Sequence, residues 1–190
     1  MKIRPYQKKD FRYVQDICVA SSKHAGDDNP TTRATLTAMY CDYYLDNQSD
    51  YCYVAVDEQD IPVGYVLCSV DRGDYEESMT ELYLPLVRKL SSSDYFHWIS
   101  EIKVTGRYVR QGYLAHMHVN VLEDYQRQGI GSELVNTLEN KLREMYVEGV
   151  YLICGEKQEG ARAFCEKMGY EDIDFLSGTV VYGKKFYTEE

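Results

Sequence analysis

The chain has 190 residues, which is enough for one domain with a sizeable core and leaves little room for a second. Hydrophobic residues make up 44% and charged residues 27%, a composition that excludes a disordered chain. The net charge of −10 argues against a nucleic-acid partner, because phosphate binding needs clustered Lys and Arg. Apolar runs are too short to span a membrane and the first residues do not form a secretory signal, so we expect a cytoplasmic protein with no membrane partner.

The first part of the chain predicts a strand, two helices and a strand hairpin. Residues 2–6 read as a short strand, and residues 9–22 place apolar side chains at the spacing of an amphipathic helix. After a loop of turn residues, a second helix is expected to begin at a threonine cap, Thr31 or Thr32. Residues 51–70 predict two strands joined by a turn.

The middle of the chain is expected to carry an insertion and then a central strand. Residues 71–94 are polar with a helical pattern of leucines, residues 98–104 look like a strand, and residues 105–112 form a polar loop. Residues 115–122 predict a strand with two different faces, because successive side chains point to opposite sides. The apolar face holds Ala115, Met117, Val119 and Val121, and the polar face holds His116, His118 and Asn120.

The last part alternates helices and strands. A helix is expected over residues 129–148, a short buried strand over 151–154 and a helix over 157–168, followed by two strands near 170–175 and 179–186. This order is typical of an α/β protein. We therefore expect one domain over residues 1–190, with a central mixed β-sheet flanked by helices and a helical insertion at residues 71–94.

The cysteines point to burial rather than to cross-links or metal. There are six, with no C-x-x-C pair, and four of them lie in apolar stretches where thiols behave as small hydrophobes. A disulfide framework is unusual in a chain of this length without a signal, and the ligand spacing of structural zinc is missing. We expect no metal.

The segment Gln126 to Gly131 has the chemistry of a phosphate site. Two glycines, Gly129 and Gly131, stand where a strand-to-helix loop becomes a helix. The first helical turn has free N–H groups, and glycine lets an anion approach them closely. A dinucleotide fingerprint would need glycine at Leu134, and a mononucleotide P-loop would need Gly-Lys-Ser/Thr, so neither fits.

Gln126-x-x-Gly129-x-Gly131 resembles the Q/R-x-x-G-x-G/A signature of the GNAT acetyltransferases. Residues 119–131 resemble the whole strand-to-helix segment of that family, with Glu123 in place of its common proline. Residues 113–121 are similar to bacterial GNAT proteins akin to the acetyltransferase-like domain of O-GlcNAc hydrolases. The order of elements along nearly all of the chain also resembles a single-domain GNAT fold.

The resemblance implies acetyl-CoA as the cosubstrate and a primary amine as the acceptor. It implies that the backbone of Val119 and Val121 binds the pantetheine arm, although both valines also suit plain core packing. The implied pyrophosphate site consists of Gln126, Arg127, Gln128, Gly129, Ile130, Gly131 and Ser132. The glycines also fit an ordinary turn. Similar proteins are commonly homodimers.

A second family motif is altered here. Gln158 stands where the family has asparagine, and Cys165 stands where a tyrosine often protonates the departing thiolate. Cys165 could be a poor general acid, an inert core residue or a sign of lost catalysis, because a thiol is a weak donor with a reference pKa of about 8.5. We favour the inert interpretation.

The proton acceptor has several candidates. An ammonium has no lone pair with which to attack, so acetyl transfer needs a base. His118 and His116 suit this role if they titrate near neutrality, and each could instead be a hydrogen-bonded spacer. Asn120 lies on the same strand face where the hydrolase-associated relatives commonly have aspartate, and Glu101 on the preceding predicted strand is a further candidate.

Two functions remain open from the sequence. The first is direct transfer of acetyl from acetyl-CoA to a primary amine on a small molecule or a protein. The second is a non-catalytic domain that only binds acetyl-CoA, which the missing tyrosine and aspartate make credible.

Overall fold

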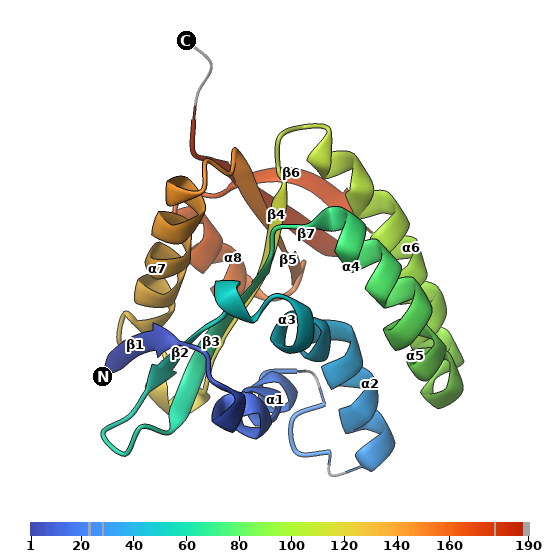
Figure 1. The fold of residues 1–190 in the computed structure, drawn as a ribbon, viewed down its shortest axis with the longest axis horizontal. Helices are drawn as coiled ribbons and strands as arrows, with labels where there is room; N and C mark the ends of the chain where they lie inside the picture. The colour runs from blue at the N-terminus through green and yellow to red at the C-terminus, as the bar shows by residue number, and fades with distance from the viewer. Residues whose placement is uncertain (23, 28, 177, 188–190) are drawn as a thin grey trace.

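A seven-stranded sheet runs through the middle of the molecule, with helices on both of its faces (Figure 1). The computed structural model describes residues 1–22, 24–27, 29–176 and 178–187. The strand order is β1-β2-β3-β4-β5-β7-β6, and β4 and β5 are parallel while the other neighbours are antiparallel. The predicted α/β class with a central mixed sheet is confirmed.

The elements have the following bounds. The strands are β1 Lys2–Pro5, β2 Tyr53–Val56, β3 Pro62–Ser69, β4 Ala115–Val121, β5 Gly149–Gly155, β6 Glu171–Leu176 and β7 Thr179–Lys185. The helices are α1 Phe11–Ala20, α2 Pro30–Tyr40, α3 Asp42–Asn47, α4 Arg72–Ser78, α5 Leu84–Leu90, α6 Ser92–Val109, α7 Ile130–Glu144 and α8 Glu159–Lys167. A single π-turn, Met79–Tyr83, joins α4 to α5. None of the helices in the described ranges has the length and apolar character that a bilayer crossing requires.

The two faces of the sheet bury different side chains. Helix α7 packs on β2, β3 and β4 with an apolar stripe that includes Leu134, Leu138 and Leu142. Helices α1 and α3 contact β3 from the opposite side, where the core is rich in tyrosine. The alternation along β4 follows prediction: Met117 joins the α7 core, whereas His116 lies against Tyr44 on the other side.

The largest correction concerns the segment after the insertion. Residues 98–104 form no strand, and the loop predicted over residues 105–112 begins only after Val109, because α6 continues to that residue as one helix. Its buried positions, Trp98, Ile102, Thr105 and Tyr108, recur every three or four residues, which is the period of a helix. Within a short window of sequence, the charged residues between these positions obscure the helical period. Glu101, expected on a strand, and His97 both lie on α6.

Three helix ends also differ from the prediction. Helix α2 is capped by Asn29, whose side chain accepts a hydrogen bond from Thr31 N at 2.8 Å, rather than by a threonine. It ends at Tyr40, and α3 begins at Asp42 because Cys41, with a φ of −136°, interrupts the helical backbone. Helix α7 stops at Glu144, and Tyr146 with a φ of 57° turns the chain, so that Gly149 opens β5.

Candidate functional site

The parallel strands β4 and β5 separate soon after they meet. They pair only at Ala115↔Val150 and His116↔Tyr151, although each strand has seven residues. Beyond this point the two strands form a fork whose edges have backbone groups free for a ligand. The fork therefore supplies a slot in the middle of the sheet.

The backbone of β4 faces the fork at alternate residues. Leu122 N donates to Val63 O at 2.9 Å, and in an antiparallel pair every second residue shares this direction. The main-chain groups of Asn120 and His118 therefore bond to β3. Those of Val119 and Val121 point to the fork, where the sequence analysis expects the pantetheine arm.

The loop after β4 is held by its glutamine side chains. Gln126 Nε2 donates to the carbonyl oxygen of Val121 at 2.9 Å, and Gln128 Nε2 donates to that of Asp124 at 3.0 Å. Both side chains thus brace the loop rather than pointing free amides outward. Arg127 adopts a φ of 60°, which brings the exposed chain around to the start of α7.

Glycine is required at positions 129 and 131 for different structural reasons. Gly129 is the N-cap of α7 with a φ of 86°, and a Cβ added there would meet no atom within 4 Å. Its surroundings are thus open to an approaching anion. A Cβ at Gly131 would lie 3.3 Å from the ring of Phe164, so this glycine lets α8 pack against α7. Ile130 is buried between them and anchors the turn.

The first turn of α7 presents unpaired amides beside this open surface. Glu133 N donates to Gly129 O at 3.0 Å as the first helical bond, which leaves the N–H groups of residues 130–132 directed out of the helix start. Ser132 is half-buried there. The loop can therefore bind a diphosphate through its backbone.

A small pocket lies where β4 and β5 diverge, and we call it the inner pocket. It has a volume of about 20 Å³, enough for about one water molecule. The strands contribute His118 and Tyr151, among others, and α6 closes the pocket with Trp98 and Glu101. The fork and the candidate bases thus meet at one place.

Glu101 is the inner-pocket group best suited to accept a proton at neutral pH. Burial raises its pKa from 4.5 to about 7, because loss of water disfavours the charged carboxylate. The imidazole Nε2 of His97 lies 3.8 Å from the carboxylate. A carboxylate with this pKa is partly ionised at neutral pH and binds a proton readily.

The two histidines have lower pKa values than the sequence analysis expects. Burial, and then the neighbouring His118 and Arg72, lower the pKa of His116 well below 6.5. His116 Nε2 lies 2.7 Å from the hydroxyl oxygen of Tyr44, so it is fixed in the tyrosine-rich core. Burial lowers the pKa of His118 to about 4. Both rings are neutral at pH 7, and the expectation of titration near neutrality is wrong.

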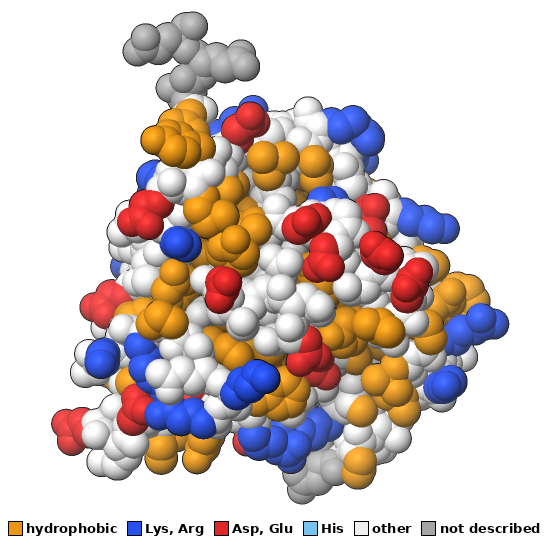
Figure 2. Space-filling view, in the orientation of Figure 1, with side chains coloured by type: hydrophobic (Ala, Val, Ile, Leu, Met, Phe, Trp, Pro, Cys, Tyr) orange, Lys and Arg blue, Asp and Glu red, His pale blue; other side chains and the backbone are white. Residues whose placement is uncertain are grey.

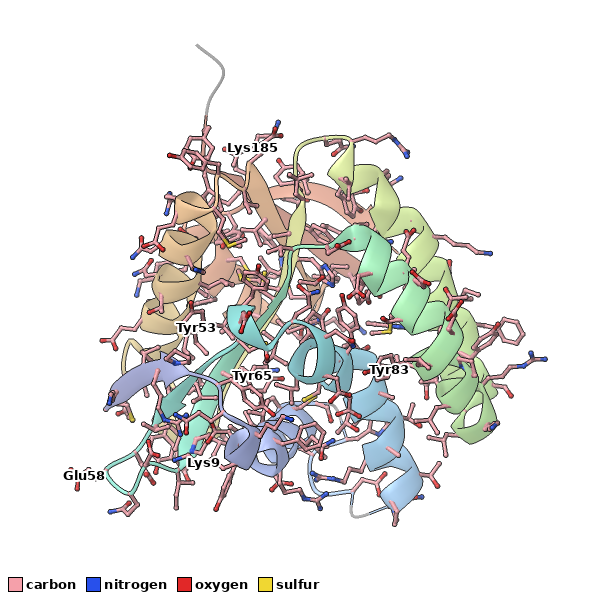
Figure 3. The ribbon with its side chains drawn as sticks, in the orientation of Figure 1. Lys9, Tyr53, Glu58, Tyr65, Tyr83 and Lys185 are labelled. Atoms are coloured by element: carbon pink, nitrogen blue, oxygen red, sulfur yellow. The ribbon has the colours of Figure 1, made fainter. Side chains whose placement is uncertain are left out.

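The remaining predicted residues lie apart from the inner pocket. Asn120 Nδ2 donates to the hydroxyl of Tyr65 at 2.7 Å, and the side chain of this β3 tyrosine packs in the core that α1 covers (Figure 3). Cys165 is only 2% exposed and packs in the aliphatic core. A hydrogen bond with Cys154 and burial raise the pKa of its thiol. All six cysteines are free and buried.

Sequence reasoning missed the part of α6 that closes the pocket. Trp98 and Thr105 contact the same space as Glu101, and only the three- and four-residue spacing of these positions could have found them. In the described part of the chain, no three His, Cys, Asp or Glu side chains come together as a metal site.

Comparison with known proteins identifies one family and several similar structures. The sequence model of the acetyltransferase (GNAT) family matches residues 20–170. No curated protein sequence is significantly similar. A solved structure named SsHAT is 24% identical with a TM-score of 0.84, and the match covers 98% of each chain.

Two further structures are similar in fold. PH1933 from Pyrococcus horikoshii is 19% identical with a TM-score of 0.64, covering 98% of this chain and 99% of that chain. The PaiA N-acetyltransferase from Thermoplasma acidophilum, solved with coenzyme A, is 12% identical with a TM-score of 0.63, covering 97% and 98%. At these identities the likeness concerns the fold.

Proposed function

Since this chain belongs to the acetyltransferase (GNAT) family, we propose that it transfers acetyl from acetyl-CoA directly to a primary amine. One observation carries the proposal: the fork between β4 and β5 leads to an inner pocket that contains Glu101 and His118. A donor lying along the free edge of β4 would bring its thioester to a buried base. The structure of PaiA with coenzyme A supports the same donor for this fold.

The donor is bound mainly by the backbone in this proposal. The main-chain groups of Val119 and the N–H of Val121, whose carbonyl already accepts from Gln126, hold the pantetheine arm, and the amides of residues 130–132 hold the pyrophosphate. Arg127 and Ser132 lie beside these amides, and Gln126 and Gln128 fix the loop. Because α7 begins there, its macrodipole adds to the attraction of the anion.

The chemistry needs one proton acceptor. The amine nitrogen attacks the thioester carbonyl and a C–N bond forms. As the C–S bond breaks, the remaining excess proton on the nitrogen passes to the departing sulfur, directly or through water, and CoA leaves as a thiol. The ammonium must first lose a proton, and Glu101 accepts it directly or through one water in the inner pocket. His118, with a pKa of about 4, is too weak a base for this step and orients the acceptor. His116 and Asn120 position the strand through Tyr44 and Tyr65.

Cys165 carries no step in this mechanism. Its buried position beside Cys154 and its raised pKa make it a poor acid, which supports the inert interpretation. The same substitution favours the second candidate function, a domain that binds acetyl-CoA without turning it over. We further propose, on the sequence alone, a kinship with the O-GlcNAc hydrolase-associated proteins, a cytoplasmic location and a homodimer.

A panel of amines separates enzyme from binder. We expect purified protein to release CoA from acetyl-CoA faster when a suitable primary amine is added, with acetylated amine found by mass spectrometry. The control is Glu101→Gln, which should bind acetyl-CoA normally in calorimetry and lose the stimulation. Tight binding of acetyl-CoA with no stimulation by polyamines, aminoglycosides, amino sugars or basic peptides would favour the non-catalytic function.

A further inference from the structure

A second, larger cavity lies next to the inner pocket, and we call it the outer chamber. It has a volume of about 300 Å³, at the small end of the range for ligand sites. Helix α2 forms one side with Thr35, Met39 and Tyr40, and the start of α6 forms the other with Asp94 and His97. The chamber is therefore large enough for a compact organic molecule, whereas the inner pocket holds little more than a water.

Helix α6 connects the two cavities by a row of side chains. Asp94 lines the outer chamber and Glu101 lines the inner pocket, seven residues further along the same helix. Seven residues are two turns, so both carboxylates lie on one face with about 10 Å between them along the axis. His97 lies between the two. The path from one cavity to the other thus has an acidic group at each end.

The partition between the cavities is aromatic. Tyr40 lines the outer chamber, and its ring lies edge-on to Trp98 at 4.9 Å and to His118 at 5.7 Å between centroids. Trp98 and His118 belong to the inner pocket. An aliphatic chain packs well along such rings, and a cation is attracted to their faces.

Trp98 supplies an independent sign that this path takes a ligand. Its side chain is only 2% exposed, and among the described residues its indole Nε1 finds no hydrogen-bond partner. A buried donor without a partner is costly, so native structures rarely leave one unless a ligand or water completes it. Glu101 lines the same pocket, and among the described residues no Lys or Arg side chain forms a salt bridge with it.

We propose that the acceptor is an elongated dication, a primary amine that carries a second cationic group about 10 Å from the reacting nitrogen. Asp94 binds the distal cation in the outer chamber, the aliphatic spacer lies against Tyr40, and the reacting nitrogen reaches Glu101 and His118. This inference rests on the proposed function and specifies its substrate class.

Charge supports this class over neutral or anionic acceptors. Among the described residues that line the outer chamber, Asp94 is the one carboxylate, and Lys and Arg are absent. Acidic side chains also gather on the surface over α4 (Figure 2), and the chain as a whole carries −10. This field attracts cations to the side of the molecule that α4 to α6 cover. A monoamine would leave Asp94 without a partner.

The test compares unbranched α,ω-diamines of increasing length with monoamines of the same length. For wild type, we expect kcat/KM to peak for diamines whose nitrogens lie about 10 Å apart and to exceed that of the matched monoamine about ten- to hundredfold. Asp94→Asn keeps the size and removes the charge, so it should remove most of this preference. Glu77→Gln, which removes an exposed carboxylate from α4, is the control for net charge and should keep it.

Direct binding keeps this inference separate from the proposed function. Calorimetry with the best diamine should show affinity that Asp94→Asn weakens about tenfold or more, while acetyl-CoA affinity stays unchanged. Diamine binding without turnover would support the site and refute the enzyme. Turnover of amines with no preference for the diamine would refute the inference. So would a loss of kcat/KM in Asp94→Asn that is equal for diamines and monoamines. Either result would leave the proposed function standing.

Discussion

The two faces of the sheet are built from different kinds of side chain. Under α7 and α8 the core is mostly aliphatic, with Leu134, Val135 and Leu138 fully buried. Under α1 to α6 it is aromatic, and the rings of Tyr44 and Tyr75 pack edge-on against His116. The first face carries the open loop at the start of α7, and the second carries the titratable groups.

This difference assigns the two substrates to two kinds of recognition. Backbone groups at the fork and at the start of α7 would bind acetyl-CoA, and their placement depends on the fold and on glycine rather than on side-chain identity. The acceptor would instead meet side chains, whose identity sets both charge and pKa. Substitutions on the aromatic face should therefore alter catalysis, and those in the loop should alter donor affinity.

The largest effect is expected from Glu101→Gln on the aromatic face. Removing the proton acceptor should lower kcat by about 10²-fold or more, with acetyl-CoA affinity unchanged. In wild type kcat/KM should rise with pH through about 7, because the base must be ionised, and the variant should lose this limb. Acceptors of different basicity separate this limb from the ionisation of the amine itself. A pH profile that survives the substitution would contradict the role of Glu101.

The same substitution should stabilise the fold at alkaline pH. The folded pKa of Glu101 is raised from 4.5 to about 7, so its contribution is fully present below pH 4.5 and is lost as pH rises through 7. The shift corresponds to about 3 kcal/mol between these limits. Urea unfolding at pH 5 and pH 8 should show wild type losing stability that Glu101→Gln retains. Equal pH dependence of the two proteins would show that the carboxylate is not buried.

The donor loop should respond in affinity rather than in rate. Gly129→Val places a branched side chain in the open space at the start of α7, and we expect it to weaken acetyl-CoA binding about ten- to hundredfold in calorimetry. Valine is also strained at a φ of 86°. Gly26→Val is a matched control, because Gly26 has a φ of 82° and equally open surroundings in another loop. Similar losses of acetyl-CoA affinity in both variants would show that the effect comes from backbone strain.

The aliphatic face was the more predictable of the two from sequence. The stripe of α7 and the alternation of β4 are strong periodic signals and both are observed, except that Met145, predicted as the last residue of the stripe, lies beyond the helix end and is exposed. The glycines at positions 129 and 131 mark a loop whose geometry depends on backbone freedom, which a residue type can reveal. A binding site made of backbone groups can therefore be located from the glycines that its backbone conformation requires.

The aromatic face was predictable only in part. Helix α6 was misread because its charged residues interrupt the apolar pattern within any short window. Consequently Glu101 was placed on a strand, and the contribution of Trp98 was missed altogether. The histidines were found, but burial lowers their pKa values, and His116 is covered by Tyr44 and Tyr75, which lie far from β4 in sequence. Tertiary packing, which no local pattern encodes, sets the chemistry here.

His118 should have a smaller effect than Glu101. If it orients the acceptor, His118→Gln should raise KM for the amine and lower kcat by less than about tenfold, since glutamine keeps a polar side chain of similar reach. Because burial lowers its pKa to about 4, the limb near pH 7 should be unchanged in this variant. Steady-state kinetics from pH 5 to 9 tests this. If the rise of kcat/KM near pH 7 disappeared in His118→Gln, His118 rather than Glu101 would be the proton acceptor.

The smallest effect on turnover is expected at Cys165, on the aliphatic face. Its thiol packs in the core beside Cys154, so Cys165→Ala should cost about 1–2 kcal/mol of unfolding free energy while kcat changes less than about threefold. Cys68→Ala is a matched control, because Cys68 is buried in the same core on β3 and lines neither cavity in the described structure. If both residues only pack, both variants should lose stability and keep activity. A loss of kcat of about 10²-fold in Cys165→Ala alone, with acetyl-CoA affinity intact, would show that the thiol protonates the leaving group and that the aliphatic face takes part in the chemistry.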